Sequence, residues 1–452
     1  MNMKKIFIGL LTACYLIATT TYAQEEPQKA LNFSQALEMA YLYDQDLQAA
    51  EFQYQSALES RGLSKAALLP QLNFSISAQT ARTKIEKSQS NQFVPNRELT
   101  INTDAYALSL TQTLYNHSLY KNLQQTDMII AAAAANIDAA RQDLIVRLAS
   151  AYFNVLGAQD GLKFASAEKE AIGKQLEQSK KRFEVGLIAI TDVKEAQASY
   201  DTSVAQEIDS QNILYAQFEA LAVILGSYTT KIAPLAKEIT LSIPLPADIQ
   251  AWTDSAQQHN LTLKAAQFNF QASQKQVDAD QSQHYPTLDL VANRNFNSPD
   301  NSIFSGLASD TTSNSLTVQL NVPIYSGGFT SAKKRQSVAL KDQARAQKEK
   351  AHRQALQQTR DAYLGVTSTI AQVQALKQAL ISNQAAHEAT QAGFEVGTRT
   401  AIDVLSTLRE VYRAERDYAR ARYNYVINTL RLKQAAGTLT MDDGIAINNF
   451  LQ

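Results

Sequence analysis

The residue types best suited to chemistry are few and scattered in this chain. Its five histidines stand far apart, and no two have the spacing of a metal-binding pair: they are His117, His259, His284, His352 and His387. The sequence contains neither a glycine-rich phosphate-binding loop nor a nucleophile-elbow motif. It therefore predicts no catalytic centre, no cofactor and no metal site, and a protein that is not an enzyme.

Two aspartates occur instead in a repeated setting. The motif Phe-Glu-Val-Gly occupies 183–186 and 394–397, and Asp192 and Asp403 follow it, so the spacing is 397 − 186 = 403 − 192 = 211 residues. A glycine in this position ends a helix by adopting a left-handed conformation. An aspartate in the next turn favours a helix start through the helix dipole. Each motif therefore predicts a tight turn between two helices.

Further landmarks repeat at nearly the same offset and identify a tandem duplication. Gly226 matches Gly437 at 211 residues, and Pro70 matches Pro286 at 216. A repeat of this length is half a molecule, so the two halves share one fold. The predicted organisation is a first repeat over 24–226, a linker over 227–250, a second repeat over 251–437 and a tail over 438–452.

The segment 1–23 has the features of an export signal. Two lysines precede an apolar run over 6–18, and a small-residue cleavage site ends at Ala23. The alternative is that Leu11–Cys14 is an acylation site that attaches a lipid to Cys14. No later stretch of about 18 apolar residues predicts a transmembrane helix. The formal net charge of −1 gives no electrostatic reason to bind nucleic acid.

Each repeat is predicted to begin with a helix that leads into a strand hairpin. In the first repeat, apolar residues recur at helical spacing from Leu31 to Leu69, Ser34 is the expected N-cap, and Pro70 ends the helix. Apolar and polar residues then alternate in hairpins at about 71–115 and 287–325.

A very long helix and a return helix are predicted to complete each repeat. The runs over 118–185 and 329–396 contain no proline and few glycines, which predicts helices about 100 Å long. The return helices start near Asp192 and Asp403 and end near Gly226 and Gly437. Polar helices of this length favour the wall of a coiled coil or helical barrel.

Each predicted strand has about ten residues, with one apolar and one polar face, as in transmembrane barrels. A soluble, half-buried hairpin has the same pattern, so the pattern leaves both interpretations open. Four strands are too few to close a barrel, and lipid does not tolerate open sheet edges. Insertion would therefore require several chains to contribute to one barrel.

Three motifs in this order make the chain resemble the TolC family of outer-membrane exit ducts, which serve drug efflux and type I secretion. They are a first tip at 183–193, a second tip at 396–405 followed by 421–428, and a strand-to-helix bend at 323–328 with Gly327 and Gly328. The resemblance covers essentially the whole mature chain.

The resemblance implies a mixed α and β membrane protein. Three identical chains would form a twelve-stranded transmembrane β-barrel, continued by a twelve-helix periplasmic α-barrel. The implied place is the outer membrane of a Gram-negative bacterium, in contact with its lipid and with a long periplasmic extension. The implied function is a passive exit channel, gated at its periplasmic tip, that works with a periplasmic adaptor protein and an inner-membrane pump of RND, ABC or MFS type.

The resemblance also assigns roles to residues at the tips. The turns that dock the adaptor in the family correspond here to Val185, Gly186, Leu187, Val396, Gly397 and Thr398. A ring of aspartates narrows the family's pore, which assigns the constriction to Asp403. The family's second aspartate, three residues on, is Ser406 in this chain, which halves the expected ring charge.

The gate contacts carried over from the family are Thr191, Asp192, Phe394 and Arg399. Phe394 stands where the family often has a tyrosine whose hydroxyl bonds an aspartate matching Asp192, and phenylalanine has no hydroxyl. Arg399 is retained and is expected to bridge to Thr191, Asp192 or a backbone carbonyl. The closed gate is therefore expected to be held more weakly, or by other contacts.

Two other functions fit parts of the sequence. A periplasmic coiled-coil adaptor or scaffold without a pore would contain comparable long helices. A diffusion porin would contain strands of this kind, but porins lack the long helices.

Overall fold

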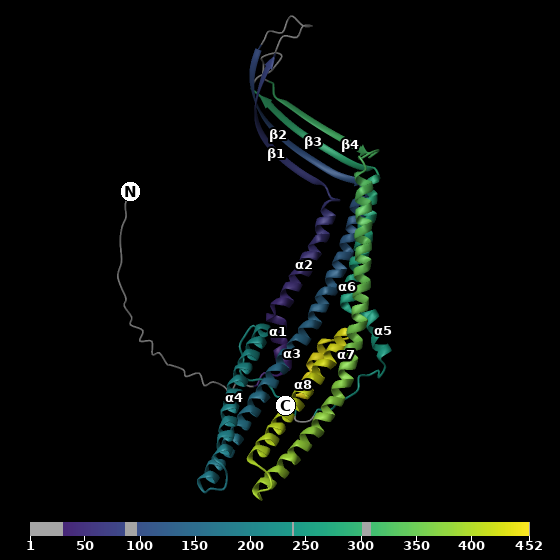
Figure 1. The fold of residues 1–452 in the computed structure, drawn as a ribbon. Coiled ribbons are helices and arrows are strands. Elements are labelled where there is room, and N and C mark those ends of the chain that lie inside the picture. The colour runs from purple at the N-terminus through teal and green to yellow at the C-terminus, as the bar shows by residue number, and fades with distance from the viewer. Residues whose placement is uncertain (1–29, 86–96, 237–238, 301–308, 452) are drawn as a thin grey trace, which may run out of the picture.

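The computed structural model describes residues 30–85, 97–236, 239–300 and 309–451; the expected signal at 1–23, with Cys14, lies outside them. The helices are α1 Phe33–Tyr43, α2 Gln45–Ala66, α3 His117–Glu184, α4 Ile190–Leu225, α5 Ile249–His259, α6 Leu261–Gln281, α7 Phe329–Glu395, α8 Ala401–Ala435 and α9 Met441–Ala446, with short turns η1 Ser282–His284 and η2 Ile447–Phe450. The strands are β1 Gln71–Ile85, β2 Arg97–Tyr115, β3 Thr287–Pro299 and β4 Thr311–Asn321. The sheet lies at one end of the molecule, and the hairpins α3–α4 and α7–α8 turn at the other end (Figure 1).

The expectation of one helix from Leu31 to Leu69 is wrong, because Asp44 breaks it. The backbone of Asp44 is extended, and its carboxylate caps α2 by accepting a 2.8 Å hydrogen bond from the N–H three residues on. Arg147 of α3 binds the same carboxylate at 2.9 Å. In the second repeat Asn260 separates α5 from α6 in the same way, at the offset that also relates Pro70 to Pro286.

Other element boundaries also differ from the expected ones. Asn32, rather than Ser34, caps α1. The strands β1 and β2 have 15 and 19 residues, longer than the expected length of about ten. β4 ends at Asn321, ahead of a proline that cannot donate to the sheet, so it does not reach 325.

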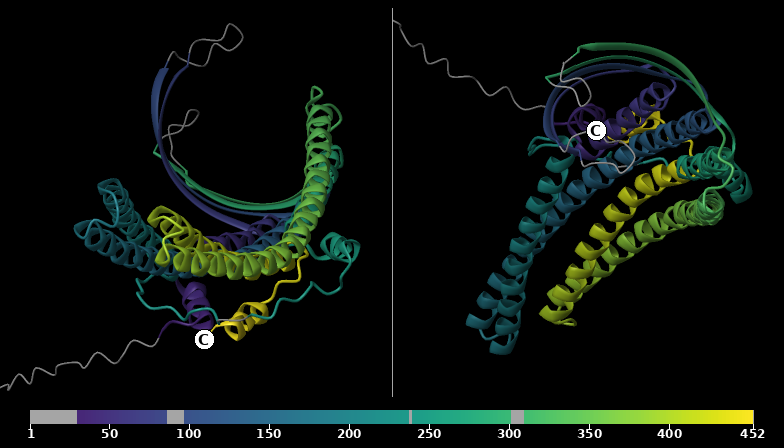
Figure 2. Two further views of the ribbon diagram at one scale, coloured as in Figure 1. Left: turned by 60° about the horizontal axis from the view of Figure 1, so that its bottom comes forward. Right: turned by 90° about the horizontal axis from the view of Figure 1, so that it is seen from above.

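The sheet is antiparallel in the order β1-β2-β3-β4. Paired residues of neighbouring strands share a face. One row across the four strands contains Leu72, Leu110, Ala292 and Leu316, and the next row, on the opposite face, contains Asn73, Ser109, Asn293 and Ser315. One face of the sheet is therefore apolar and the other polar. The sheet curves strongly, and β1 and β4 are its open edges (Figure 2).

At mid-height, the return helices meet the shorter helices end to end. Where α8 meets α6, Nδ2 of Asn260 donates to the carbonyl of Ala435 at 3.0 Å. Gly437 follows with a φ of +73°, and a Cβ there would lie 2.3 Å from the backbone of His259, so only glycine fits. Each helix within the described ranges is too short or too polar to span a membrane.

The main core lies at the same height, around the fully buried Tyr152 of α3. Its hydroxyl donates to the carbonyls of Leu31 and Ala233, both at 2.9 Å. The linker and tail lie on the convex side of the helical layer (Figure 2), where Leu235 forms a β-bridge with Leu451. The core thus fastens the linker to the long helices far from the tips.

Candidate functional site at the hairpin tips

Both helix turns at the tip use the same backbone device. Gly186 after α3 has a φ of +74°, and Gly397 after α7 has a φ of +78°. In each turn the residue after the glycine donates its N–H to the carbonyl five residues back, at 2.9 Å in the first turn and 2.8 Å in the second. These bonds satisfy carbonyls that a helix end otherwise leaves unpaired.

The starts of the two return helices differ. α4 follows Ala189, which provides no side-chain cap, and its first turn contains the exposed Thr191 and the half-buried Asp192. α8 follows Thr400, whose hydroxyl accepts from the Asp403 N–H at 3.2 Å, while the Asp403 carboxylate accepts from the Thr400 N–H at 3.0 Å. This hydrogen bond from the Thr400 backbone is the main reason that the pKa of Asp403 is lowered.

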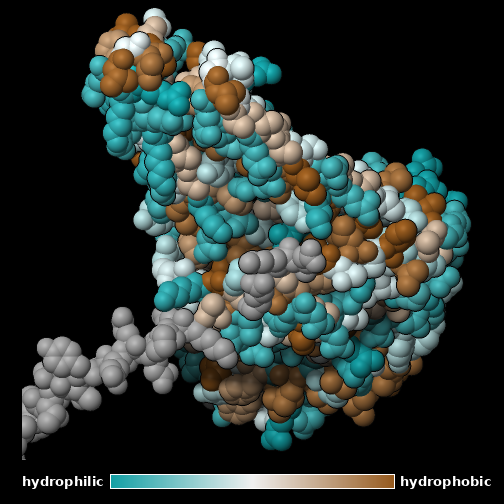
Figure 3. Space-filling model, turned by 90° about the horizontal axis from the view of Figure 1, so that it is seen from below, coloured by the Kyte–Doolittle hydropathy of each residue, from teal (hydrophilic) through white to brown (hydrophobic). Residues whose placement is uncertain are grey.

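The outermost side chains of the turns are mostly apolar and exposed. Val185, Leu187 and Val396 are 69%, 72% and 76% exposed. Thr398 is the exception, because its hydroxyl donates back to the carbonyl of Gly393 at 3.0 Å. Viewed from below, apolar patches interrupt the polar surface of the molecule (Figure 3). Exposed apolar side chains gathered at one end are typical of a surface that meets a partner.

Phe394 is buried beneath an arginine of the other hairpin. The guanidinium carbon of Arg182 lies 4.2 Å from the centroid of the Phe394 ring, which packs against the start of α8. Sequence reasoning misses Arg182, because only the packing of the hairpins brings the two side chains together. The available signal is the seven-residue spacing of Glu168, Gln175 and Arg182, which puts them on one face of α3.

Arg399 does not meet its expected partners within one chain. Across the described ranges, no hydrogen bond or ion pair joins it to Thr191 or Asp192. Its stem lies over Gly393, where an added Cβ would come within 2.9 Å of the Arg399 Cγ. Its charge contributes to the lowered pKa of Asp403. Within one chain Arg399 thus acts on Asp403 through its charge, and its contact with the first turn stays a prediction.

The proposed constriction residues are neighbours on α8. Asp403 is half-buried and Ser406 is exposed, and residues three apart lie beside each other on a helix surface. A ring needs several copies of the chain, so the constriction also stays a prediction.

The bend between strand and helix depends on two glycines in left-handed conformations. Gly327 has a φ of +64° and Gly328 a φ of +81°. Gly328 is the N-cap of α7, and the N–H of Phe329 donates to the Ser326 carbonyl at 3.1 Å. The chain therefore turns from the sheet into α7 within a few residues after β4.

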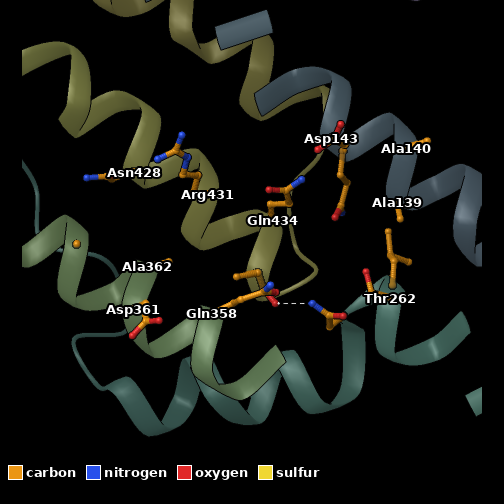
Figure 4. A pocket seen from close by; sticks show the side chains of 15 residues that line it. Ala139, Ala140, Asp143, Thr262, Gln358, Asp361, Ala362, Asn428, Arg431 and Gln434 are labelled. Carbon is orange, nitrogen blue, oxygen red and sulfur yellow. Dashed lines mark hydrogen bonds between the residues drawn. The ribbon is translucent and has the colours of Figure 1, made fainter. Parts of the chain in front are cut away.

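A polar groove lies at mid-height, where α3, α6, α7 and α8 meet (Figure 4). Acidic, basic and uncharged polar side chains share its lining: Asp143, Thr262, Gln358, Asp361, Arg431 and Gln434. Its charged lining residues are two aspartates and one arginine, so charges of both signs face the groove. Within the described residues, no three or more His, Cys, Asp and Glu side chains form a group that could hold a metal ion. His117 and His387 instead contact hydroxyls, of Ser282 at 2.7 Å and of Thr407 at 3.2 Å.

Comparison with known proteins gives consistent results for the whole chain. The family model described as outer membrane efflux protein matches residues 36–227 and 252–438. The outer membrane protein TolC of Escherichia coli is 33% identical, over 99% of this chain and 90% of its own. The proteases secretion protein PrtF of Dickeya chrysanthemi is 27% identical, over 94% and 92%. The solved structure of the outer membrane protein VceC of Vibrio cholerae has a TM-score of 0.75 at 19% identity, over 90% of this chain and 96% of VceC. The chain therefore belongs to the outer membrane efflux protein family.

Proposed function

We propose that three copies of this chain form a passive exit channel in the outer membrane of a Gram-negative bacterium, which serves drug efflux and type I secretion and opens at the hairpin tips. Membership of the outer membrane efflux protein family supports the channel and its location. PrtF, the relative named for protease secretion, supports the proposed role in type I secretion. The observation that carries the proposal is the sheet, which has an exposed apolar face and two open edges.

The apolar face of the sheet is suited to lipid. Leu72 on β1 and Leu320 on β4 are 64% and 63% exposed, although burying such side chains is worth about 1.5 to 3 kcal/mol each. On β2, Leu108 is exposed, while Ala107 and Ser109 on the other face are half-buried. This difference is expected when a sheet curves so that its apolar face lies on the outside. The apolar side chains therefore line the convex side and the polar ones the concave side.

The open edges require further copies of the chain. In hydrocarbon each unpaired backbone N–H or C=O costs several kcal/mol, so neither β1 nor β4 can remain an edge there. If β4 of each copy pairs with β1 of the next, three copies close a ring of twelve strands that has no open edge. Side chains fill the interior of a barrel of roughly eight strands, so a barrel of twelve is wide enough to leave a polar lumen.

The helices extend this barrel as a tunnel that ends at the tips. α3 and α7, with 68 and 67 residues, are about 100 Å long. The exposed Val185, Leu187 and Val396 are suited to dock a periplasmic adaptor that links the channel to an inner-membrane pump of RND, ABC or MFS type. The pump supplies the energy, and this chain supplies a conduit without catalysis.

The gate is proposed at the second turn. Three copies of Asp403 would face one another at the narrow end, concentrating negative charge and favouring cations. With Ser406 in place of a second aspartate, the ring holds one charge per chain. Arg399 beside Asp403 is suited to link neighbouring helix ends when the tips are closed.

Membrane fractionation and planar-bilayer recording test the proposal. An exit channel is recovered from the outer membrane as a heat-resistant trimer and gives a low resting conductance. A periplasmic adaptor or scaffold without a pore, the alternative, would yield neither the trimer in that fraction nor any conductance.

A further inference from the structure

We propose that Arg182 and Phe394 form a latch that holds the α7–α8 hairpin against the α3–α4 hairpin at the tip. The latch rests on the proposed channel function, in which these hairpins must part for the duct to open. It identifies a contact within each chain that resists opening, in place of the missing tyrosine hydroxyl.

The geometry of the pair is that of a cation held over an aromatic face. The guanidinium carbon of Arg182, in the last turn of α3, lies 4.2 Å from the ring centroid of Phe394, in the last turn of α7. Attraction of this kind acts within about 6 Å and strengthens when water is excluded. The Phe394 ring is only 4% exposed, so the contact is well shielded. It joins the ends of two helices from different hairpins.

The same contact does not form at the matching ring of the first repeat. Phe183 corresponds to Phe394 at 394 − 183 = 211 residues, yet its side chain is 41% exposed. The residue that corresponds to Arg182 is Gly393, which provides no cation. The latch is therefore a property of the contact between the hairpins, and the repeated motif alone does not produce it.

A second charged contact lies on the same face of α3. Glu168, two heptads before Arg182, is 13% exposed and faces Arg416 at 3.7 Å and Arg409 at 4.0 Å, both on α8. Seven-residue spacing keeps side chains on one side of a helix in a coiled coil. The face of α3 that meets the second hairpin thus carries an acid nearer mid-height and a base at the tip.

Gln175 lies between these two contacts and opposes them. It is 7% exposed, and its Nε2 has no hydrogen-bond partner in the part of the chain that the structure describes. A buried donor without an acceptor is destabilising, and parting of the hairpins gives it access to water. The face between the hairpins therefore combines two contacts that hold it closed with one group that favours opening.

Single-channel conductance and the vancomycin sensitivity of cells test the latch. Arg182→Gln and Phe394→Leu should each raise the resting conductance, by shifting the opening equilibrium about 2- to 30-fold per chain. The double variant should go no further than the stronger single variant, because both remove the same contact. Gln175→Met should act in the opposite direction and lower the conductance, because it replaces the unpaired amide by an apolar group of similar size.

Matched controls separate the latch from general damage. Phe183→Leu, at the exposed ring of the first repeat, should leave the conductance unchanged. Arg182→Lys and Phe394→Tyr keep a cation and a ring, so neither should raise it as Arg182→Gln does. If the Phe394→Leu variant does not form a trimer, the difference in conductance between Arg182→Gln and Arg182→Lys tests the latch by itself.

Two results would overturn the latch while leaving the channel intact. One is an unchanged conductance for Arg182→Gln in a trimer that conducts, and the other is additive effects in the double variant. Absence of any conductance in the wild-type trimer would instead contradict the proposed function, and the latch with it.

Discussion

At the first turn of the tip the ring of Phe183 is 41% exposed, whereas at the second turn the matching ring of Phe394 is 4% exposed. The backbones of the two turns agree, since Gly186 and Gly397 have φ values of +74° and +78°. Arg182 of the neighbouring hairpin lies over the second ring, and Ala401 and Val404 of its own hairpin also pack against it. The two turns thus share a backbone conformation, while their side chains differ where the hairpins meet.

The residues beyond the glycines diverge in the same way. Ile188 of the first turn packs into an apolar cluster with Leu176 and Val193, whereas its counterpart Arg399 lies beside Asp403. Both turns have apolar packing and backbone hydrogen bonds, and the second turn adds charged groups and the side-chain hydrogen bonds of Thr400 and Asp403. We expect substitutions that change charge to act mainly at the second turn.

The largest effect is expected in the sheet, where the repeats should behave alike. Leu110 and Leu320 are matched positions, 320 − 110 = 210 residues apart. Leu110→Arg and Leu320→Arg should each cost about 2 to 4 kcal/mol if the side chain faces lipid near the midplane. The yield of heat-resistant trimer in the outer membrane measures this loss.

Arginine on the opposite face is the control for the sheet. Thr111→Arg and Asn321→Arg should be tolerated, since these side chains face the polar lumen. Equal losses on both faces would show that the barrel assignment is wrong. A loss at only one of the two leucines would show that the repeats are not equivalent in the membrane.

The next largest effect is expected at Gly186 and Gly397, and substitutions in the two repeats should again have similar effects. Gly186→Asp and Gly397→Asp force a charged side chain into a left-handed conformation, at a cost of roughly 1 to 2 kcal/mol. Export should be lost because the turn that meets the adaptor is distorted, while the trimer should remain on gels. If the trimer itself disappears, the glycines serve only to cap the helices.

Charge removal should distinguish the two turns. Asp403→Asn keeps an acceptor for the Thr400 N–H and removes the negative charge, so cation selectivity and block by multivalent cations should fall. Asp192→Asn, at the matching position, should change both quantities less. Unchanged reversal potentials for Asp403→Asn would mean that the constriction lies elsewhere.

Arg399→Ala should loosen the closed tip. It removes a cation beside Asp403 that is available to link neighbouring helix ends. Resting conductance and sensitivity to vancomycin should rise, and Arg399→Lys should restore part of the barrier. A conductance equal to that of the wild type would remove Arg399 from the gate.

The smallest effect is expected from a single hydroxyl. Phe394→Tyr keeps the ring beneath Arg182 and adds a donor for Asp192, so the resting conductance should fall slightly. Phe183→Tyr, with its ring exposed, should leave the conductance unchanged. A rise for Phe394→Tyr would contradict both the added bond to Asp192 and the latch.

The resemblance to the TolC family is confirmed by the family model and the relatives, and with it the mixed α and β fold. It was predictable because its signals are local: a glycine at a helix end, an aspartate one turn later, and alternation along a strand each depend on a few neighbouring residues. The repeat boundaries stay predictions. The roles of the tip residues also stay predictions, because they concern an assembly larger than one chain.

The long helices and the tip turns could be predicted from the sequence, because backbone preferences act between near neighbours. Where those preferences yield to packing depends on tertiary contacts. The break at Asp44 is held by Arg147 of α3, and the cover over Phe394 of α7 comes from Arg182 of α3, so both contacts join segments far apart in the sequence. Seven-residue spacing places Arg182 on one face of α3, but the partner that Arg182 or Arg147 contacts depends on how whole helices lie against one another.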